Sequence, residues 1–255
     1  MNKSERLGWV MLFSIIVSVF GFFTVLALAA YSTGPTETVA WRKPVVGSIF
    51  ALICLLGIVL TLSPRKCSET FGHKNKLEAA TSFPQASYSV FNIKGHHYDC
   101  GKFSTHTIQV KGHVLCAACT GLFLGAFGAL FGTAIFFFAE WESRPIGFFA
   151  VVLGVVAMVF GFLQFKFGGF ARLILNMLFV LGALLILAGM DGLTGSLLVD
   201  LFSIVLIAFW IFTRILLSQW DHWKICRRCP ISCEIRGSKV GSISSAQSVE
   251  GADYD

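Results

Sequence analysis

Charged side chains are scarce in this sequence. Of its 255 residues, 13% are charged and 55% are hydrophobic, and the mean hydropathy is +0.75. Soluble globular domains usually carry about 25% charged residues. Because so little charge cannot cover the surface of a soluble protein, the composition argues against a water-soluble domain and favours a membrane protein.

The motifs of several large enzyme classes are also missing. The sequence has no P-loop, no dinucleotide-binding fingerprint, no H-E-x-x-H and no G-x-S-x-G. It shows neither an intramembrane chain of acidic residues nor the paired broken helices of a transporter. The net charge is +6, but no basic-aromatic module accompanies it, so we expect no nucleic-acid partner. The leading interpretation is therefore non-enzymatic.

Hydrophobic residues gather in six long blocks. A transmembrane helix needs about 20 mostly apolar residues, and backbone groups in hydrocarbon must be satisfied within the helix. We therefore predict an all-α membrane protein: a six-transmembrane-helix bundle with a cytoplasmic Cys/His-rich loop and tail. The predicted helices are about Gly8–Tyr31, Val45–Leu62, Val114–Phe138, Ile146–Phe165, Leu173–Met190 and Ser196–Leu217.

These blocks divide the chain into five regions. Residues 1–63 hold the first two helices, 64–113 the Cys/His-rich loop, 114–218 a four-helix core, 219–237 a cysteine tail and 238–255 a tail expected to be disordered. Lys and Arg collect in the long loop, the loop after the fourth helix and the tail. The positive-inside rule then predicts a multi-pass protein of the cell membrane, surrounded by lipid, with both termini in the cytoplasm.

Glycines recur at helical spacing on the third and fourth predicted helices. Small residues let helices approach closely in lipid. We interpret the repeat as packing within one bundle, in preference to a homodimer interface. The glycines are Gly121, Gly125, Gly128 and Gly132, and then Gly147, Gly154 and Gly161.

Seven of the eight cysteines lie in or beside segments that this topology assigns to the cytoplasm, where disulfides are disfavoured. Two C-x-x-C pairs stand out: Cys116 with Cys119, where the third helix begins, and Cys226 with Cys229, after the sixth. Two such pairs are the usual source of four thiolates for tetrahedral zinc. We therefore predict that the two pairs meet in one structural zinc site.

The loop and tail supply further metal-ligand candidates, either as substitutes in that site or as ligands of a second one. The tail motif C-x-x-C-P-x-x-C also fits an iron–sulfur cluster, whose ligands are thiolates. These further candidates are Cys100, Cys233, His97, His106 and His113.

Other interpretations of the cysteines stay open. Cys116 lies at the N-terminus of a predicted helix, a position that lowers the pKa of a thiol and favours the attacking thiolate. A thiol redox pair is therefore an alternative to a structural metal, as is a catalytic or electron-carrying metal. Cys54 lies inside an apolar block, and we predict that it is a packing residue.

Cys100 stands twelve residues before Gly112, and Cys116–Gly121 reads C-x-x-C-x-G as it enters a helix. This arrangement, over about residues 95–190, resembles a family of small uncharacterised prokaryotic membrane proteins defined by a domain of unknown function. The chain has Ala118 where that family has arginine. The resemblance implies a membrane protein with a thiol motif and no particular reaction. Later positions that fit the family loosely are Gln164, Arg172 and Asn176.

Three functions follow from these patterns. The first is an integral membrane scaffold or accessory subunit with a cytoplasmic Cys/His metal site, zinc being the expected cofactor. The second is a subunit of a membrane electron-transfer complex that carries an iron–sulfur centre, with other subunits of that complex as partners. The third is a quinone-linked thiol oxidoreductase.

Overall fold

The computed structural model describes residues 3–32, 34, 40–62, 106–110, 113–139 and 146–227. Two short strands precede the third long helix, a π-helical turn over Ala134–Phe138 continues it, and a 3₁₀ turn over Leu163–Lys166 follows the fourth. The long helices and strands are α1 (Lys3–Ala30), α2 (Arg42–Leu62), β1 (Thr107–Val110), β2 (His113–Cys116), α4 (Ala117–Thr133), α5 (Gly147–Phe162), α6 (Gly169–Thr194) and α7 (Leu197–Arg227).

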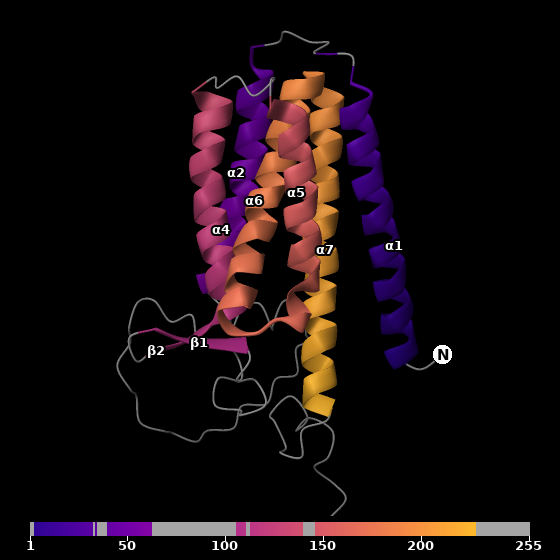
Figure 1. Cartoon of the computed structure of the whole chain (residues 1–255), viewed down its shortest axis with the longest axis vertical. Coiled ribbons are helices and arrows are strands. Elements are labelled where there is room, and N and C mark those ends of the chain that lie inside the picture. Colours follow the sequence, from indigo (N-terminus) through magenta and orange to yellow (C-terminus); the bar gives the residue numbers. More distant parts are fainter. Residues whose placement is uncertain are drawn as a thin grey trace, which may run out of the picture.

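Six helices within the described residues are long and apolar enough to cross a membrane, which confirms the predicted number. Large apolar side chains cover the outside of the bundle; Phe20, Phe127 and Phe149 are 72%, 65% and 73% exposed. Such a surface is unfavourable in water and suits lipid. The starts of α1 and α4 and the end of α7 lie at one end of the bundle, at the bottom of Figure 1. We call this the dithiol end, because Cys116 and Cys119 lie there.

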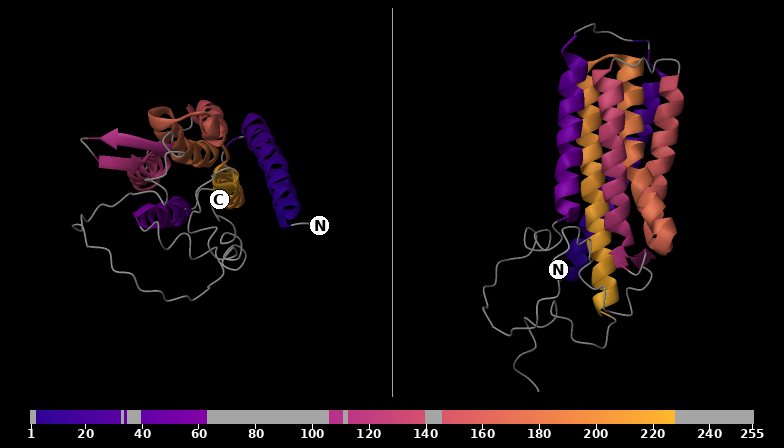
Figure 2. Two further views of the ribbon diagram at one scale, coloured as in Figure 1. Left: turned by 90° about the horizontal axis from the view of Figure 1, so that it is seen from below. Right: turned by 90° about the vertical axis from the view of Figure 1, so that its left-hand side faces the viewer.

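Several helix boundaries differ from the predicted ones, and the two that bear most on the site are the start of α4 and the end of α7. α4 begins at Ala117, not Val114, because His113–Cys116 forms β2, which pairs antiparallel with β1 so that Thr107 lies opposite Cys116. Each strand has only four residues, too few for a clear alternating pattern. α7 continues to Arg227, ten residues beyond the predicted end at Leu217. The hairpin lies beside α4, on the opposite side of the bundle from α1 (Figure 2).

α6 lies at the centre of the bundle and packs against α4, α5 and α7. Glycines permit this: a Cβ at Gly154 of α5 would lie 2.7 Å from the carbonyl oxygen of Gly182 on α6, and a Cβ at Gly121 of α4 would collide with the carbonyl oxygen of Leu173. These glycine faces therefore contact a neighbouring helix of the same chain. The interpretation of the glycine repeat as packing within one bundle is confirmed.

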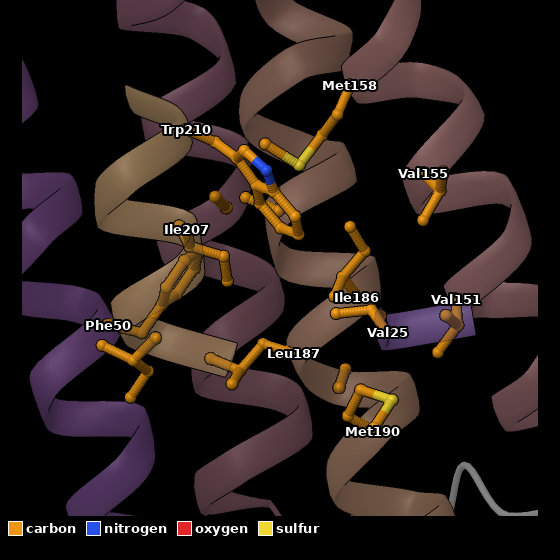
Figure 3. Packing of buried hydrophobic residues seen from close by; sticks show 14 of the residues in the cluster. Val25, Phe50, Val151, Val155, Met158, Ile186, Leu187, Met190, Ile207 and Trp210 are labelled. Atoms are coloured by element: carbon orange, nitrogen blue, oxygen red, sulfur yellow. The ribbon is translucent and has the colours of Figure 1, made fainter. Parts of the chain in front are cut away.

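The core between the helices is apolar and aromatic. In Figure 3, Trp210 and Ile207 of α7 lie beside Ile186 and Leu187 of α6, with Met158 of α5 nearby. The Trp210 ring stacks on Phe22 of α1, with ring centroids 4.4 Å apart. Cys54 belongs to this core and is 4% exposed, which confirms it as a packing residue.

Candidate functional site: a dithiol beside buried arginines

Cys116 and Cys119 are positioned by the junction between the hairpin and α4. Cys116 is the last residue of β2 and the N-cap of α4, with extended backbone angles (φ −72°, ψ 116°). Cys119 lies in the first helical turn, and the hydroxyl of Thr120 donates a hydrogen bond to the carbonyl oxygen of Cys116 at 2.9 Å. Both thiols are half-buried, and neither forms a disulfide.

This environment stabilises the thiolate of Cys116. A hydrogen bond from the Cys119 side chain lowers the pKa of Cys116 most; burial opposes that effect, while the backbone N–H groups of Cys119 and Ala118 and the charge of Arg172 add to it. Together they lower the pKa of Cys116 from about 9.0 to about 6. Cys116 is therefore mostly a thiolate at neutral pH, the form that attacks electrophiles and binds metals.

Two buried arginines lie near the cysteines. Arg172, in the first turn of α6, is 4% exposed, and Arg214 of α7 is 6% exposed. Arg214 donates hydrogen bonds to Oδ1 of Asn176 and, at 3.4 Å, to Oε1 of Gln164. Its guanidinium also lies 5.4 Å from the centre of the Phe179 ring. Arg214 faces the interior of the bundle, where its hydrogen-bond partners are neutral.

The carboxylate of Asp221, on α7, lies close to Arg172 of α6 and to His106, the residue before β1. Its Oδ2 lies 3.3 Å from Nη2 of Arg172 and 3.9 Å from Nε2 of His106. Within the described residues no carboxylate forms an ion pair with Arg214. The Nε atoms of Arg172 and Arg214 are both buried and make no hydrogen bond there. The dithiol thus lies at the same end of the bundle as two buried arginine N–H donors that have no hydrogen-bond acceptor within the described residues.

A second polar cluster lies at the opposite end. Arg42, at the start of α2, pairs with Asp191 of α6 at 2.6 Å and with Asp200 of α7. All three are at least nine-tenths buried. Gly195, in the left-handed region (φ +55°), ends α6 and permits the tight turn into α7. That turn brings the two aspartates of consecutive helices to one guanidinium.

No family model, no curated protein and no solved structure matches this chain. The resemblance to the family with a domain of unknown function therefore stays a prediction.

The described part of the chain contains no group of three or more His, Cys, Asp or Glu residues able to hold a metal. His106 lies near Asp221, and His113 begins β2, its backbone opposite Val110. Cys226 lies in the last turn of α7, about 7.5 Å along the helix beyond Asp221. The shared zinc site stays a prediction, since the remaining proposed ligands lie outside the described residues: Cys100, Cys229, Cys233 and His97.

Sequence analysis missed the ion pairs of this protein. Gln164 and Asn176, which the sequence offered as loose matches to the family resemblance, are hydrogen-bond partners of Arg214. Sequence analysis assigned no partner to Asp221 or to Arg42. Charged residues inside or at the edge of the apolar blocks could have revealed these ion pairs. Because a charge is costly in a membrane, it usually has a charged or hydrogen-bonding partner nearby.

Proposed function

We propose that this chain is a multi-pass protein of the cell membrane, with both termini in the cytoplasm, that carries out thiol–disulfide exchange at Cys116 and Cys119. The observation that carries the proposal is the pairing of the two thiols at the N-terminus of α4, which lowers the pKa of Cys116 to about 6. A C-x-x-C pair with a thiolate at a helix N-terminus is the arrangement found in thiol oxidoreductases.

The proposed orientation follows from the distribution of basic residues. The starts of α1 and α4 and the end of α7 share the dithiol end (Figure 1). Basic residues of the segments at this end include Lys3, Arg6, Lys166 and Lys224. Such an excess of Lys and Arg marks the cytoplasmic side. In that reducing compartment the pair would rest in its reduced form and act on a disulfide substrate.

The exchange uses both cysteines in turn. The Cys116 thiolate attacks one sulfur of the substrate disulfide, the substrate S–S bond breaks, and the leaving thiolate carries away the negative charge. Cys119, after losing its proton to water or to the departing thiolate, attacks Sγ of Cys116. This second step releases the other half of the substrate as a thiolate and leaves a Cys116–Cys119 disulfide. The substrate gains two electrons and the protein loses two.

The first test is the pH dependence of Cys116 alkylation. We expect the rate of iodoacetamide labelling at Cys116, followed by peptide mass spectrometry, to rise with a midpoint near pH 6, against about 9.0 for a cysteine without these interactions. Cys119→Ala removes the largest stabilising hydrogen bond and should move the midpoint upward. Cys54, in the core, is the internal control and should stay unlabelled. A Cys116 midpoint above pH 8 in the wild-type protein would rule out the activated thiolate.

A metal site remains a second candidate, because α7 holds Cys226 on the same end of the bundle as the dithiol. Asp221, five residues earlier on α7, is tied to Arg172 and His106. In this alternative the Cys116 and Cys119 thiolates bind zinc together with cysteines of the tail, as a structural scaffold.

Metal analysis of protein purified without oxygen separates the two candidates. If exchange is the function, we expect far less than one zinc or iron per chain and two thiols at Cys116 and Cys119 that oxidise reversibly. About one zinc per chain, lost in both Cys116→Ser and Cys229→Ser, would establish the scaffold instead. Iron with visible absorption would indicate the electron-transfer alternative.

A further inference from the structure

Among the buried groups that the structure describes at the dithiol end, the two arginine charges are balanced only while Cys116 is a thiolate. Two guanidinium groups, Arg172 and Arg214, lie within the bundle and are 4% and 6% exposed. Their negative counterparts in the described part of the chain are the carboxylate of Asp221, which pairs with Arg172, and the Cys116 thiolate. Arg214 has only neutral hydrogen-bond partners, so the cysteines are the anionic groups available to it.

Thiol–disulfide exchange removes one of these negative charges. When Cys116 forms a mixed disulfide, its charge departs with the leaving thiolate. Arg214 then keeps its positive charge in a buried position, surrounded by Asn176, Gln164 and the Phe179 ring. An unpaired buried charge is strongly unfavourable, and more so inside a membrane. A substrate that brings its own negative charge would restore the balance.

The arginines also have unused donors for such a group. The Nε atoms of Arg172 and Arg214 are buried and unpaired within the described residues. A guanidinium binds the paired oxygens of a carboxylate or phosphate through parallel N–H donors, and Nε is commonly one of them. Buried polar groups are nearly always satisfied in folded proteins. Two unpaired donors from neighbouring arginines therefore indicate an absent acceptor.

We propose that the disulfide substrate of this site carries an oxyanionic group close to its sulfur atoms, and that Arg172 and Arg214 bind that group during exchange. This inference rests on the proposed thiol–disulfide exchange and names its substrate class: a small anionic disulfide. Arg214 contacts the substrate anion in this scheme, while Cys116 forms and breaks the covalent bonds.

The test compares three small disulfides that differ in charge. They are 3,3′-dithiodipropionate (anionic), bis(2-hydroxyethyl) disulfide (neutral) and cystamine (cationic), each mixed with the full chain in an uncharged detergent. The protein carries Cys119→Ser, so that the mixed disulfide at Cys116 accumulates and can be quantified by peptide mass spectrometry. Rates are measured at pH 8 in one protein, so the ionised fraction of Cys116 is the same for all three reagents, and are divided by each reagent's rate with free cysteine.

We expect normalised rates in the order anionic, neutral, cationic, with on the order of tenfold between the first two at low salt. Arg214→Gln should remove the preference, and Arg214→Lys, which keeps the charge, should retain part of it. Lys166→Gln is the matched control, since it removes an exposed positive charge at the same end and should leave the preference intact. The wild-type order tests the inference even if an Arg214 variant does not fold.

The possible failures are distinguishable. Equal normalised rates for all three reagents would overturn the anionic substrate and leave exchange at Cys116 standing. The same holds if Arg214→Gln folds and keeps the full preference. No modification of Cys116 by any disulfide, in protein whose other cysteines react, would overturn the exchange itself and with it this inference.

Discussion

Replacement of Arg42 by methionine is expected to lower the free energy of unfolding by about 3–5 kcal/mol, the usual cost of removing one partner from a buried ion pair. The guanidinium of Arg42 is the ion-pair partner of both Asp191 and Asp200, which are 1% and 0% exposed. Without it, two carboxylates face each other in a buried site, and no other cation of the described residues forms an ion pair with either. Chemical denaturation in detergent micelles, with intrinsic tryptophan fluorescence as the signal, would measure the loss.

The neighbouring residue supplies the control. Lys43 lies 5.1 Å from the centre of the Phe136 ring and is half-buried, so Lys43→Met should cost only about 0.5–1 kcal/mol. The triple variant Arg42→Met, Asp191→Asn, Asp200→Asn should recover most of the stability, because it removes the charges together. If Arg42→Met costs no more than Lys43→Met, the three buried groups do not form a tightly paired cluster.

The transmembrane helices could be predicted because each depends on a local property, a long run of apolar residues. A run of about 20 apolar residues must be helical in lipid, whatever its neighbours are. The ends were less predictable: α7 continues to Arg227 through a polar segment, Gln219–Arg227, where hydropathy ends but helical hydrogen bonding does not. The β1–β2 hairpin was missed because its strands are too short to show a period.

Tertiary pairing explains most of what sequence analysis missed. Arg42 and Asp191 are 149 positions apart and read separately as charges at helix ends. Their pairing depends on the left-handed turn at Gly195 and on the position of α2 beside α7, neither of which follows from composition. The dithiol was predictable from its C-x-x-C spacing. Its arginine neighbours come from α6 and α7 and could be assigned only once those helices were placed.

Gly121→Ala should destabilise the protein by about 1–3 kcal/mol, the usual cost of overpacking. A Cβ at this position would collide with the backbone carbonyl oxygen of Leu173 and lie 2.8 Å from Cβ of Asn176. Backbone atoms of a central helix cannot rotate away as a side chain can, so α4 must move away from α6. Thermal unfolding followed by size-exclusion chromatography would detect the loss.

Gly128→Ala is the matched control, two turns further along the same helix. A Cβ there meets only Cδ2 of Leu181, at 3.3 Å, and that side chain can shift. Because alanine favours helix over glycine by up to about 1 kcal/mol, this variant should be neutral or slightly stabilising. Equal stabilities of the two variants would mean that the contact between α4 and α6 tolerates added volume at Gly121.

The same pair of variants connects the packing of the bundle to its chemistry. Movement of α4 at Gly121 carries Cys116 and Cys119 away from Arg172, whose charge helps to lower the pKa of Cys116. Gly121→Ala should therefore move the midpoint of Cys116 alkylation upward from about pH 6, while Gly128→Ala should leave it unchanged. A loss of stability without that shift would show that hydrogen bonds within the first turn of α4 suffice to hold the thiolate. A joint change would show that the close approach of α4 to α6 sets the reactivity of the dithiol.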